Sequence, residues 1–280
     1  MKYLNLGCGS RFHPSWTNVD VNISSPYVQV HDLCQGLSFP NDSFDVVYHS
    51  HLLEHLPKDI APTFIQECHR VLKPGGIIRV VVPDLERIVR LYLLALERAL
   101  LAEKDWSDHY SWLMLELYDQ TVRESSGGQM LEYLKQRPIP NEAFVYERLG
   151  GEARRLVQSS RSARSSEKNE RRSSLGNWIA GIQSIPQRAR AALIRWLLGK
   201  HDYKALQIGR FRSGGEVHQW MYDRYSLALL LEHAGFQNSI QRTAFESEID
   251  NWAQFNLDTE PDGTIYKPDS LYLEGIKPDA

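Results

Sequence analysis

The sequence predicts an α/β fold built on a mostly parallel β-sheet, and two observations near its start predict this. Short apolar runs alternate with turns and one helical stretch, which is typical of parallel strands covered on both faces. The first run, residues 3–6, leads directly into Gly7-Cys8-Gly9. Glycine adopts positive φ cheaply and lets backbone N–H groups approach a ligand closely. This turn therefore indicates a nucleotide or cofactor site at the carboxyl end of the sheet.

Each element follows from a local pattern. Helical periodicity of apolar residues predicts a helix over residues 52–72, ended by Lys73-Pro74-Gly75-Gly76. Residues 85–156 and 175–200 are also expected to be largely helical, and residues 226–235 form a helix that stops at glycine. Apolar, β-branched runs predict strands at residues 3–6, 16–21, 27–33, 44–50, 77–82, 239–244 and 270–276.

In their order and spacing, these blocks resemble a class I S-adenosylmethionine-dependent methyltransferase of the type 11 methyltransferase-domain family. The resemblance spans residues 4–84 and implies S-adenosyl-L-methionine as the cofactor. It also implies a Rossmann-like methyltransferase fold, whose mostly parallel seven-stranded sheet has an antiparallel last strand. The blocks that carry the resemblance are Gly7-Cys8-Gly9, the run Phe-Asp-Val-Val-Tyr at 44–48, Leu-Glu-His-Leu at 53–56 and Leu-Lys-Pro-Gly-Gly at 72–76.

The resemblance implies roles for individual residues as well. The Gly7–Gly9 turn would cradle the methionine part of the cofactor, and Asp20 would accept hydrogen bonds from both ribose hydroxyls. Asp32 would bind the exocyclic amine of the adenine, while Leu33 packs on the ring. The expected cofactor contacts are Asn5, Gly7, Cys8, Gly9, Asp20, Asp32, Leu33, His49 and Ser50.

Two features depart from the family pattern. Asn5 stands where the family usually has an acid. An asparagine can orient the loop by hydrogen bonds but offers no carboxylate to the cofactor's ammonium. Only residues 10–15 separate the glycine turn from the second strand, too few for a crossover helix. We therefore expect a short turn there and a more open methionine end of the site.

The elements divide the chain into a discontinuous core, residues 1–90 and 216–280, and a helical insertion or lid, residues 91–215. Residues near 157–175 are polar and poor in apolar side chains, which predicts a mobile basic segment. Residues 151–200 carry eleven Lys and Arg but three Glu, in a chain whose net charge is −3. This stretch can be a solvated lid, a contact for an anionic substrate, or a peripheral membrane contact. No recognition motif supports nucleic-acid binding.

The composition is that of a globular enzyme. Apolar residues make up 42% and charged residues 24% of the chain, which is usual for soluble folds. The three cysteines, Cys8, Cys34 and Cys68, have no metal-ligand spacing. An odd count without a secretory segment predicts reduced thiols and a cytoplasmic location. No apolar run approaches the length of a membrane span.

The stretch His51-Leu-Leu-Glu54-His55 has the H-x-x-E-H spacing, which on a helix places two imidazoles on one face. It also lies where the methyltransferases it resembles carry a similar Leu-Glu-His. We therefore favour a structural, cofactor-lining role and predict no metal. The alternatives are a methyltransferase metal site, with His218 as the distal ligand, and a hydrolytic metal site.

Methyl transfer from a sulfonium needs mainly positioning, so a base is required only for a hydroxyl or amine acceptor. The candidate catalytic residues are His51 after the fourth strand, Asp84 after the fifth, and His218 where the chain rejoins the core. Together with the basic insertion, they favour O-methylation of a small polar or glycan-type acceptor, including an anionic one. A catalytically inactive methyltransferase-like binding protein and a nicotinamide-dependent oxidoreductase are the alternatives, although the latter usually needs a third glycine.

Overall fold

The sheet has seven strands in the order β3-β2-β1-β4-β5-β7-β6 in a computed structural model. The structure describes residues 1–151, 154, 155, 157 and 177–279, and the side chains of all of these except 177–188. Strands β3, β2, β1, β4 and β5 pair in parallel, and β7 lies between β5 and β6 and pairs antiparallel with both. This arrangement confirms the predicted mostly parallel sheet with an antiparallel last strand. The strands are β1 (Tyr3–Leu6), β2 (Thr17–Asp20), β3 (Val28–Val30), β4 (Phe44–Ser50), β5 (Leu72–Pro83), β6 (Gln237–Arg242) and β7 (Ser270–Ile276).

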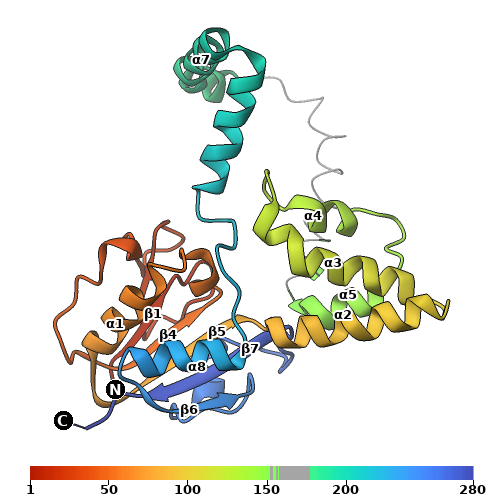
Figure 1. Ribbon diagram of the computed structural model, residues 1–280. Helices are drawn as coiled ribbons and strands as arrows, with labels where there is room; N and C mark the ends of the chain where they lie inside the picture. The colour runs from red at the N-terminus through yellow and green to blue at the C-terminus, as the bar shows by residue number, and fades with distance from the viewer. Residues whose placement is uncertain (152–153, 156, 158–176, 280) are drawn as a thin grey trace.

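One face of the sheet is covered by α1 (Ala61–Val71) and α8 (Arg224–His233) (Figure 1). The apolar residues of α1 recur at helical spacing, and Phe64, Ile65 and Cys68 are fully or almost fully buried. They join the inward side chains of β1, β4 and β5 in the largest apolar cluster of the described residues. This face therefore has the helix-on-sheet packing that the sequence pattern predicts.

Residues 243–268 cover the opposite face, where their only helical element is the 3-10 helix η4 (Trp252–Phe255). An aromatic cluster joins this segment to the sheet: Trp16 stacks on Tyr3 with ring centroids 4.8 Å apart and meets Phe255 edge-on at 5.2 Å. Residues 7–16 form turns, as expected from their number. The C-terminal segment thus occupies space that a helix between the first two strands would otherwise fill.

Arg79 fixes this segment to the middle of the sheet. Its side chain is fully buried, and its guanidinium donates to Asp258 at 2.8 and 2.9 Å and to Glu274 at 2.7 Å. It also donates to the backbone carbonyls of Thr243 and Glu246 and lies over the ring of Trp252. One cation on β5 therefore holds both ends of the covering segment.

The insertion between β5 and α8 consists of helices beyond the carboxyl end of β5, where α2 and α3 lie side by side (Figure 1). The insertion has an apolar core of its own around Trp112. Within it, Arg148 and Glu116 form a buried ion pair at 2.7 Å. Its helices are α2 (Leu85–Leu100), α3 (Trp106–Val122), α4 (Gly128–Leu134), α5 (Glu142–Leu149) and α7 (Asn177–Arg212).

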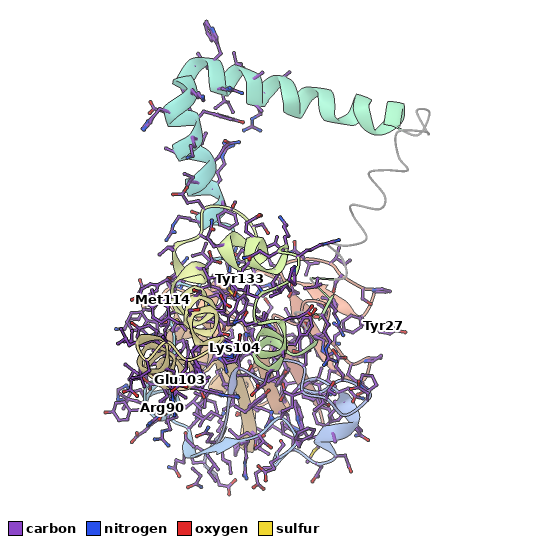
Figure 2. All side chains as sticks on the ribbon, turned by 90° about the vertical axis from the view of Figure 1, so that its right-hand side faces the viewer. Tyr27, Arg90, Glu103, Lys104, Met114 and Tyr133 are labelled. Carbon is purple, nitrogen blue, oxygen red and sulfur yellow. The ribbon has the colours of Figure 1, made fainter. Side chains whose placement is uncertain are left out.

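Helix α7 stands clear of the other helices and bends at Gly199, where φ is 74° (Figures 1 and 2). Its described side chains include exposed Leu193, Trp196 and Leu197. None of the helices formed by the described residues has the length and apolar character of a membrane span. The predicted basic segment near 157–175 lies outside the described residues, apart from Val157.

The predicted helix over residues 52–72 is wrong in its first half. Residues 53–55 form a short 3-10 helix, η2 (Leu53–His55), and α1 begins only at Ala61. Leu56 precedes Pro57 and is extended, with φ −84° and ψ 139°, because a residue before proline is disfavoured in the α conformation. The H-x-x-E-H stretch therefore lies on a turn and not along one helix face.

We expect Arg79→Met to lower the free energy of unfolding by about 3–5 kcal/mol, because it leaves two buried carboxylates without their cation. Denaturation in urea measures this loss. Arg90→Met is the matched control, because Arg90 forms an exposed pair with Glu86 and its loss should cost at most about 0.5 kcal/mol. Adding Asp258→Asn and Glu274→Gln to Arg79→Met should recover part of the stability. A loss below about 1 kcal/mol in Arg79→Met would contradict the role given to this residue.

Candidate functional site

The glycine turn has the geometry of a ligand cradle. Gly7 and Gly9 have φ values of 63° and 51°, a region that favours glycine. The backbone N–H groups of Gly7 and Cys8 both donate to the carbonyl of Val19, which fixes the turn against β2. A Cβ on Gly7 would lie 2.8 Å from the side chain of Leu52, whereas one on Gly9 would meet nothing within 4 Å. The space over Gly9 is therefore open to a ligand.

Asp20, at the end of β2, faces the same turn. Its Oδ2 accepts a hydrogen bond from the Gly9 N–H at 2.8 Å, and its Oδ1 accepts from Asn22 at 2.9 Å. A carboxylate has about four acceptor positions, and Asp20 remains partly exposed. It can therefore hold the turn and still accept hydrogen bonds from a pair of ligand hydroxyls.

Asn5 orients the glycine turn through hydrogen bonds of its side chain. Its side chain is buried, and Nδ2 donates to the carbonyl of Arg11 and to Oδ1 of Asn18, both at 3.1 Å. Arg11 in turn pairs with Glu260 at 3.2 Å and donates to the carbonyl of Thr259. The C-terminal segment thus packs against the side of the turn that the sequence predicts to be more open.

Three of the predicted cofactor residues have other roles near the turn. The carboxylate of Asp32 accepts hydrogen bonds from Gln35 and Cys34, which lower its pKa, and it caps the 3-10 helix η1 (Leu33–Gln35). Leu33 is buried in the main apolar cluster and presents little surface to an adenine ring. Burial, followed by the charge of Asp20, raises the pKa of Cys8 to about 12, so this thiol is not a nucleophile.

His49, one of the predicted cofactor contacts, lies in the core of the fold. Alternate residues of a strand face opposite sides, so His49 points into the core with Val47, while Ser50, which is half-buried, points to the other face with Tyr48. The His49 ring is fully buried and meets Phe64 edge-on at 5.3 Å, and neither ring nitrogen has a hydrogen-bonding partner. Burial lowers its pKa to about 4, which keeps the ring neutral.

His51 turns the chain out of β4 and faces a second cluster of polar groups. Its φ is 50°, an uncommon left-handed conformation for a side chain of this size. Nδ1 lies 3.1 Å from Oε1 of Glu54, and Nε2 lies 2.9 Å from the hydroxyl of Ser270 on β7. This backbone conformation places an imidazole between a carboxylate and the end of the antiparallel strand.

The segment that rejoins the core brings His218 to the same place. The N–H of Gln219 donates to the backbone carbonyl of Glu54 at 2.7 Å, and the N–H of His218 donates to the carbonyl of Gln120 on α3. The rings of His55 and His218 meet edge-on with centroids 4.7 Å apart. One ligand atom from each of Glu54, His55 and His218 lies within 4.8 Å of the others.

Burial sets the protonation of this cluster. It lowers the pKa of His55 and lowers that of His218 to about 3, although the charge of Glu54 opposes both shifts. Burial alone would raise the pKa of Glu54, but the hydrogen bond from His51 opposes burial, and this pKa lies below its ordinary value. The cluster therefore combines an ionised, fully buried carboxylate with neutral imidazoles at His55 and His218.

The cluster opens into a cavity of about 370 Å³ at the junction of the sheet, the insertion and the C-terminal segment. Two of the predicted catalytic residues, His51 and His218, line this cavity. Asp84 does not line it: its carboxylate caps α2 through the Arg87 N–H, and burial raises its pKa. Sequence reasoning missed Gln120, Arg123, Ser126, Glu216, Lys267 and Asp269, which also line the cavity.

Comparisons with known proteins bear on the N-terminal part of the chain. Residues 4–80 match a family model described as a methyltransferase domain. A stretch of 48 residues is 40% identical to a protein of Aspergillus luteorubrus named "Probable methyltransferase ltbC". This match covers 17% of the chain and 17% of that relative. The glycine turn, Asp20 and the residues from His51 to His55 all lie in the segment that matches the family.

Two solved structures align with nearly the whole chain at low similarity. One is a SAM-dependent methyltransferase from Thermotoga maritima, described as a possible histamine N-methyltransferase. It is 13% identical with a TM-score of 0.38, and the alignment covers 99% of this chain and 82% of that one. The other is a SAM-dependent methyltransferase from Archaeoglobus fulgidus: 12% identity, TM-score 0.38, 99% of this chain and 86% of that one. The strand order of the sheet, with β7 antiparallel to both of its neighbours, defines the fold independently of these two structures.

We expect His49→Leu to weaken the dependence of stability on pH. The pKa of His49 is about 4 in the folded chain against an ordinary value of 6.5. The unfolded chain therefore binds more protons between these values, and stability falls as the pH falls through this window. Urea denaturation between pH 7 and pH 4.5 should show wild type losing about 2 kcal/mol more than His49→Leu.

The control for this experiment is His201→Leu, because the His201 side chain is 96% exposed. This variant should keep the pH dependence of wild type. At pH 7, His49→Leu should be at least as stable as wild type, because it removes two buried nitrogens without partners. Equal pH dependence in His49→Leu and wild type would show that folding does not change the pKa of the ring.

Proposed function

We propose that this chain is an S-adenosyl-L-methionine-dependent methyltransferase that methylates an oxygen of a small polar or glycan-type acceptor, because residues 4–80 match a family model described as a methyltransferase domain. The observation that carries this proposal is the position of the His51–Glu54 pair. It lies at the end of β4 and lines the cavity, and the next residue, Leu52, lies directly against Gly7 of the glycine turn. A candidate base thus lies next to the candidate cofactor site.

The residues present fit the cofactor. The open space over Gly9 admits the backbone approach that a cofactor needs, and Asp20 offers acceptor positions for the ribose hydroxyls. Asn5 holds the turn through Arg11. When bound, S-adenosyl-L-methionine supplies an activated methyl group. The chain itself has only to position the acceptor and accept its proton.

His51 is the proposed base. Its Nδ1 faces the carboxylate of Glu54, which favours the tautomer that carries a proton there and stabilises the ring once it is protonated. Its Nε2 then accepts a proton, and in the structure it faces the hydroxyl of Ser270 at 2.9 Å. A hydroxyl of an acceptor in the cavity is proposed to take the position of this serine hydroxyl.

The cavity supports a polar acceptor. At about 370 Å³ it is within the size range of small-molecule sites. Its lining combines the amide of Gln120 with charged Arg123, Lys267 and Asp269, groups that suit a molecule with several hydroxyls or an anionic group. The basic residues of the insertion are proposed to contact an anionic acceptor, and exposed Trp196 on basic α7 supports membrane-surface contact as the second possibility.

A cytoplasmic location is part of the proposal and is supported by the free cysteines Cys8, Cys34 and Cys68. Neither alternative activity has comparable support. The family match is to a methyltransferase domain, and the turn lacks the third glycine usual for nicotinamide cofactors. An inactive binding protein would have no need of a base oriented by a buried carboxylate.

Asp20→Ala should weaken binding of S-adenosylhomocysteine by about 2–4 kcal/mol, because two hydrogen bonds to the ribose are lost. Isothermal titration calorimetry measures this change. Asp59→Ala removes an exposed carboxylate elsewhere and should bind like wild type. Asp20→Asn keeps an acceptor for the Gly9 N–H and so controls for disorder of the turn. Affinity of Asp20→Ala within about threefold of wild type would overturn this assignment of the cofactor site.

His51→Gln should separate binding from transfer. We expect it to bind S-adenosylhomocysteine like wild type and to lose methyl transfer by about 10²–10⁴-fold, because the base is absent. Transfer from a labelled methyl donor to a metabolite extract measures the loss and also finds the acceptor. His201→Gln, on exposed α7, is the control. Unchanged transfer in His51→Gln would mean that another group accepts the proton or that no base is needed.

A further inference from the structure

We propose that Glu54, His55 and His218 form a binding site for a divalent cation of the zinc type. The site is a property of the folded chain and does not depend on the proposed methyl transfer. It differs from the prediction of no metal, which rested on sequence alone. The structure adds the convergence of these side chains and the burial of their donor atoms.

The convergence is built by the backbone. Glu54 and His55 belong to η2, whereas His218 comes from the segment that returns from the insertion. Two N–H groups of that segment, from Gln219 and Trp220, donate to the carbonyl of Glu54 at 2.7 and 3.3 Å. The three side chains are therefore brought together by main-chain hydrogen bonds that would form with other side chains at these positions.

Three buried atoms of Glu54 and His55 lack hydrogen-bond partners. Glu54 is fully buried, and although Nδ1 of His51 lies at ion-pair distance, neither carboxylate oxygen has a hydrogen bond of acceptable geometry. The Nδ1 atom of His55 is also buried and without a partner. Buried carboxylates in folded proteins are almost always satisfied. A cation in contact with Glu54 and His55 would satisfy both residues at once.

The charges point the same way. Arg123, which lines the same cavity, already pairs with Asp119 and Glu216. Lys267 also lines the cavity, and it is the alternative source of positive charge that the experiment must exclude.

The donor set selects the metal. Imidazole nitrogens with one carboxylate suit zinc and similar transition metals, whereas magnesium prefers oxygen ligands. In a tetrahedral site with metal–ligand distances of about 2.1 Å, two donor atoms lie about 3.4 Å apart. The donor atoms of these three residues lie within 4.8 Å of one another, so small side-chain rotations are enough to bring them to that distance. The His55 ring also has a hydrogen bond to the backbone of Val217, the kind of contact that orients metal-binding histidines.

The arrangement is not that of the H-x-x-E-H protease helix. Because Pro57 ends the helical conformation, His51 and His55 do not share one helix face, and His218 supplies the distant donor. His51 has a left-handed backbone conformation that directs its ring at Glu54, and such outliers are concentrated at functional sites. The cavity lies on the open side of the three donors, so an oxygen of a bound molecule can complete the coordination.

The test uses the full-length chain, stripped with a chelator and titrated with Zn²⁺ by calorimetry. We expect one Zn²⁺ per chain, a rise in the melting temperature on adding Zn²⁺, and no comparable effect of Mg²⁺. Glu54→Gln, His55→Gln and His218→Gln should each weaken Zn²⁺ binding at least tenfold, because even loss of a residue that only orients a ligand costs 10- to 100-fold. His201→Gln should bind like wild type.

Absence of stoichiometric Zn²⁺ binding to the wild-type chain would overturn the proposal and leave Lys267 to balance the carboxylate. Zn²⁺ binding of wild-type affinity in both His55→Gln and His218→Gln would place the metal elsewhere and would also overturn the proposal. Equal affinity for Mg²⁺ and Zn²⁺ would refute the imidazole donors. If a variant fails to fold, the visible absorption of Co²⁺ bound to wild type reports nitrogen and oxygen ligands directly. Binding of S-adenosylhomocysteine, measured in parallel, keeps this result separate from the proposed function.

Discussion

The buried guanidinium of Arg79 is the interaction on which the arrangement of both candidate sites depends. It binds Asp258 and Glu274. It thereby fixes residues 243–268, which cover the face of the sheet opposite α1 and α8. That segment carries Glu260, which binds Arg11 beside the glycine turn, and leads to Ser270, which faces His51. A single charged residue in the middle of β5 therefore positions groups at two places along the carboxyl edge of the sheet.

The parts of the fold that depend on local pattern could be predicted from the sequence. Strands β1 and β4 begin and end where their apolar runs do, because a buried parallel strand needs an apolar side chain on both faces. The apolar periodicity of residues 52–72 predicts one continuous helix, but Pro57 disfavours the α conformation at Leu56 and so interrupts it. Proline was the signal in the sequence that could have corrected the prediction.

The composition of the cavity could not be predicted, because it depends on contacts between distant segments. His218 reaches Glu54 only through the return of the chain from the insertion, and Gln120 and Lys267 arrive from α3 and the C-terminal segment. His49 shows the opposite case, since its neighbour in sequence, Ser50, lies on the other face of the sheet. A shift of one residue along β4 moves a histidine from one face of the sheet to the other, and so from the core to the neighbourhood of a site. A continuous apolar run, which has no alternation of polar and apolar residues, does not show which residues face which side.

The His51–Glu54–His55–His218 cluster is difficult to explain by stability. Replacing buried charged and polar groups by apolar side chains of similar volume is often neutral or stabilising, and His49 shows that the fold already contains one buried imidazole without partners. Arg79 pairs with both Asp258 and Glu274, Arg242 also reaches Glu274, and Arg148 pairs with Glu116. Glu54 has a histidine at 3.1 Å and two neutral imidazoles. The carboxylate of Glu54 differs from these guanidinium-paired acids, and this difference is the reason to propose that a bound cation balances it.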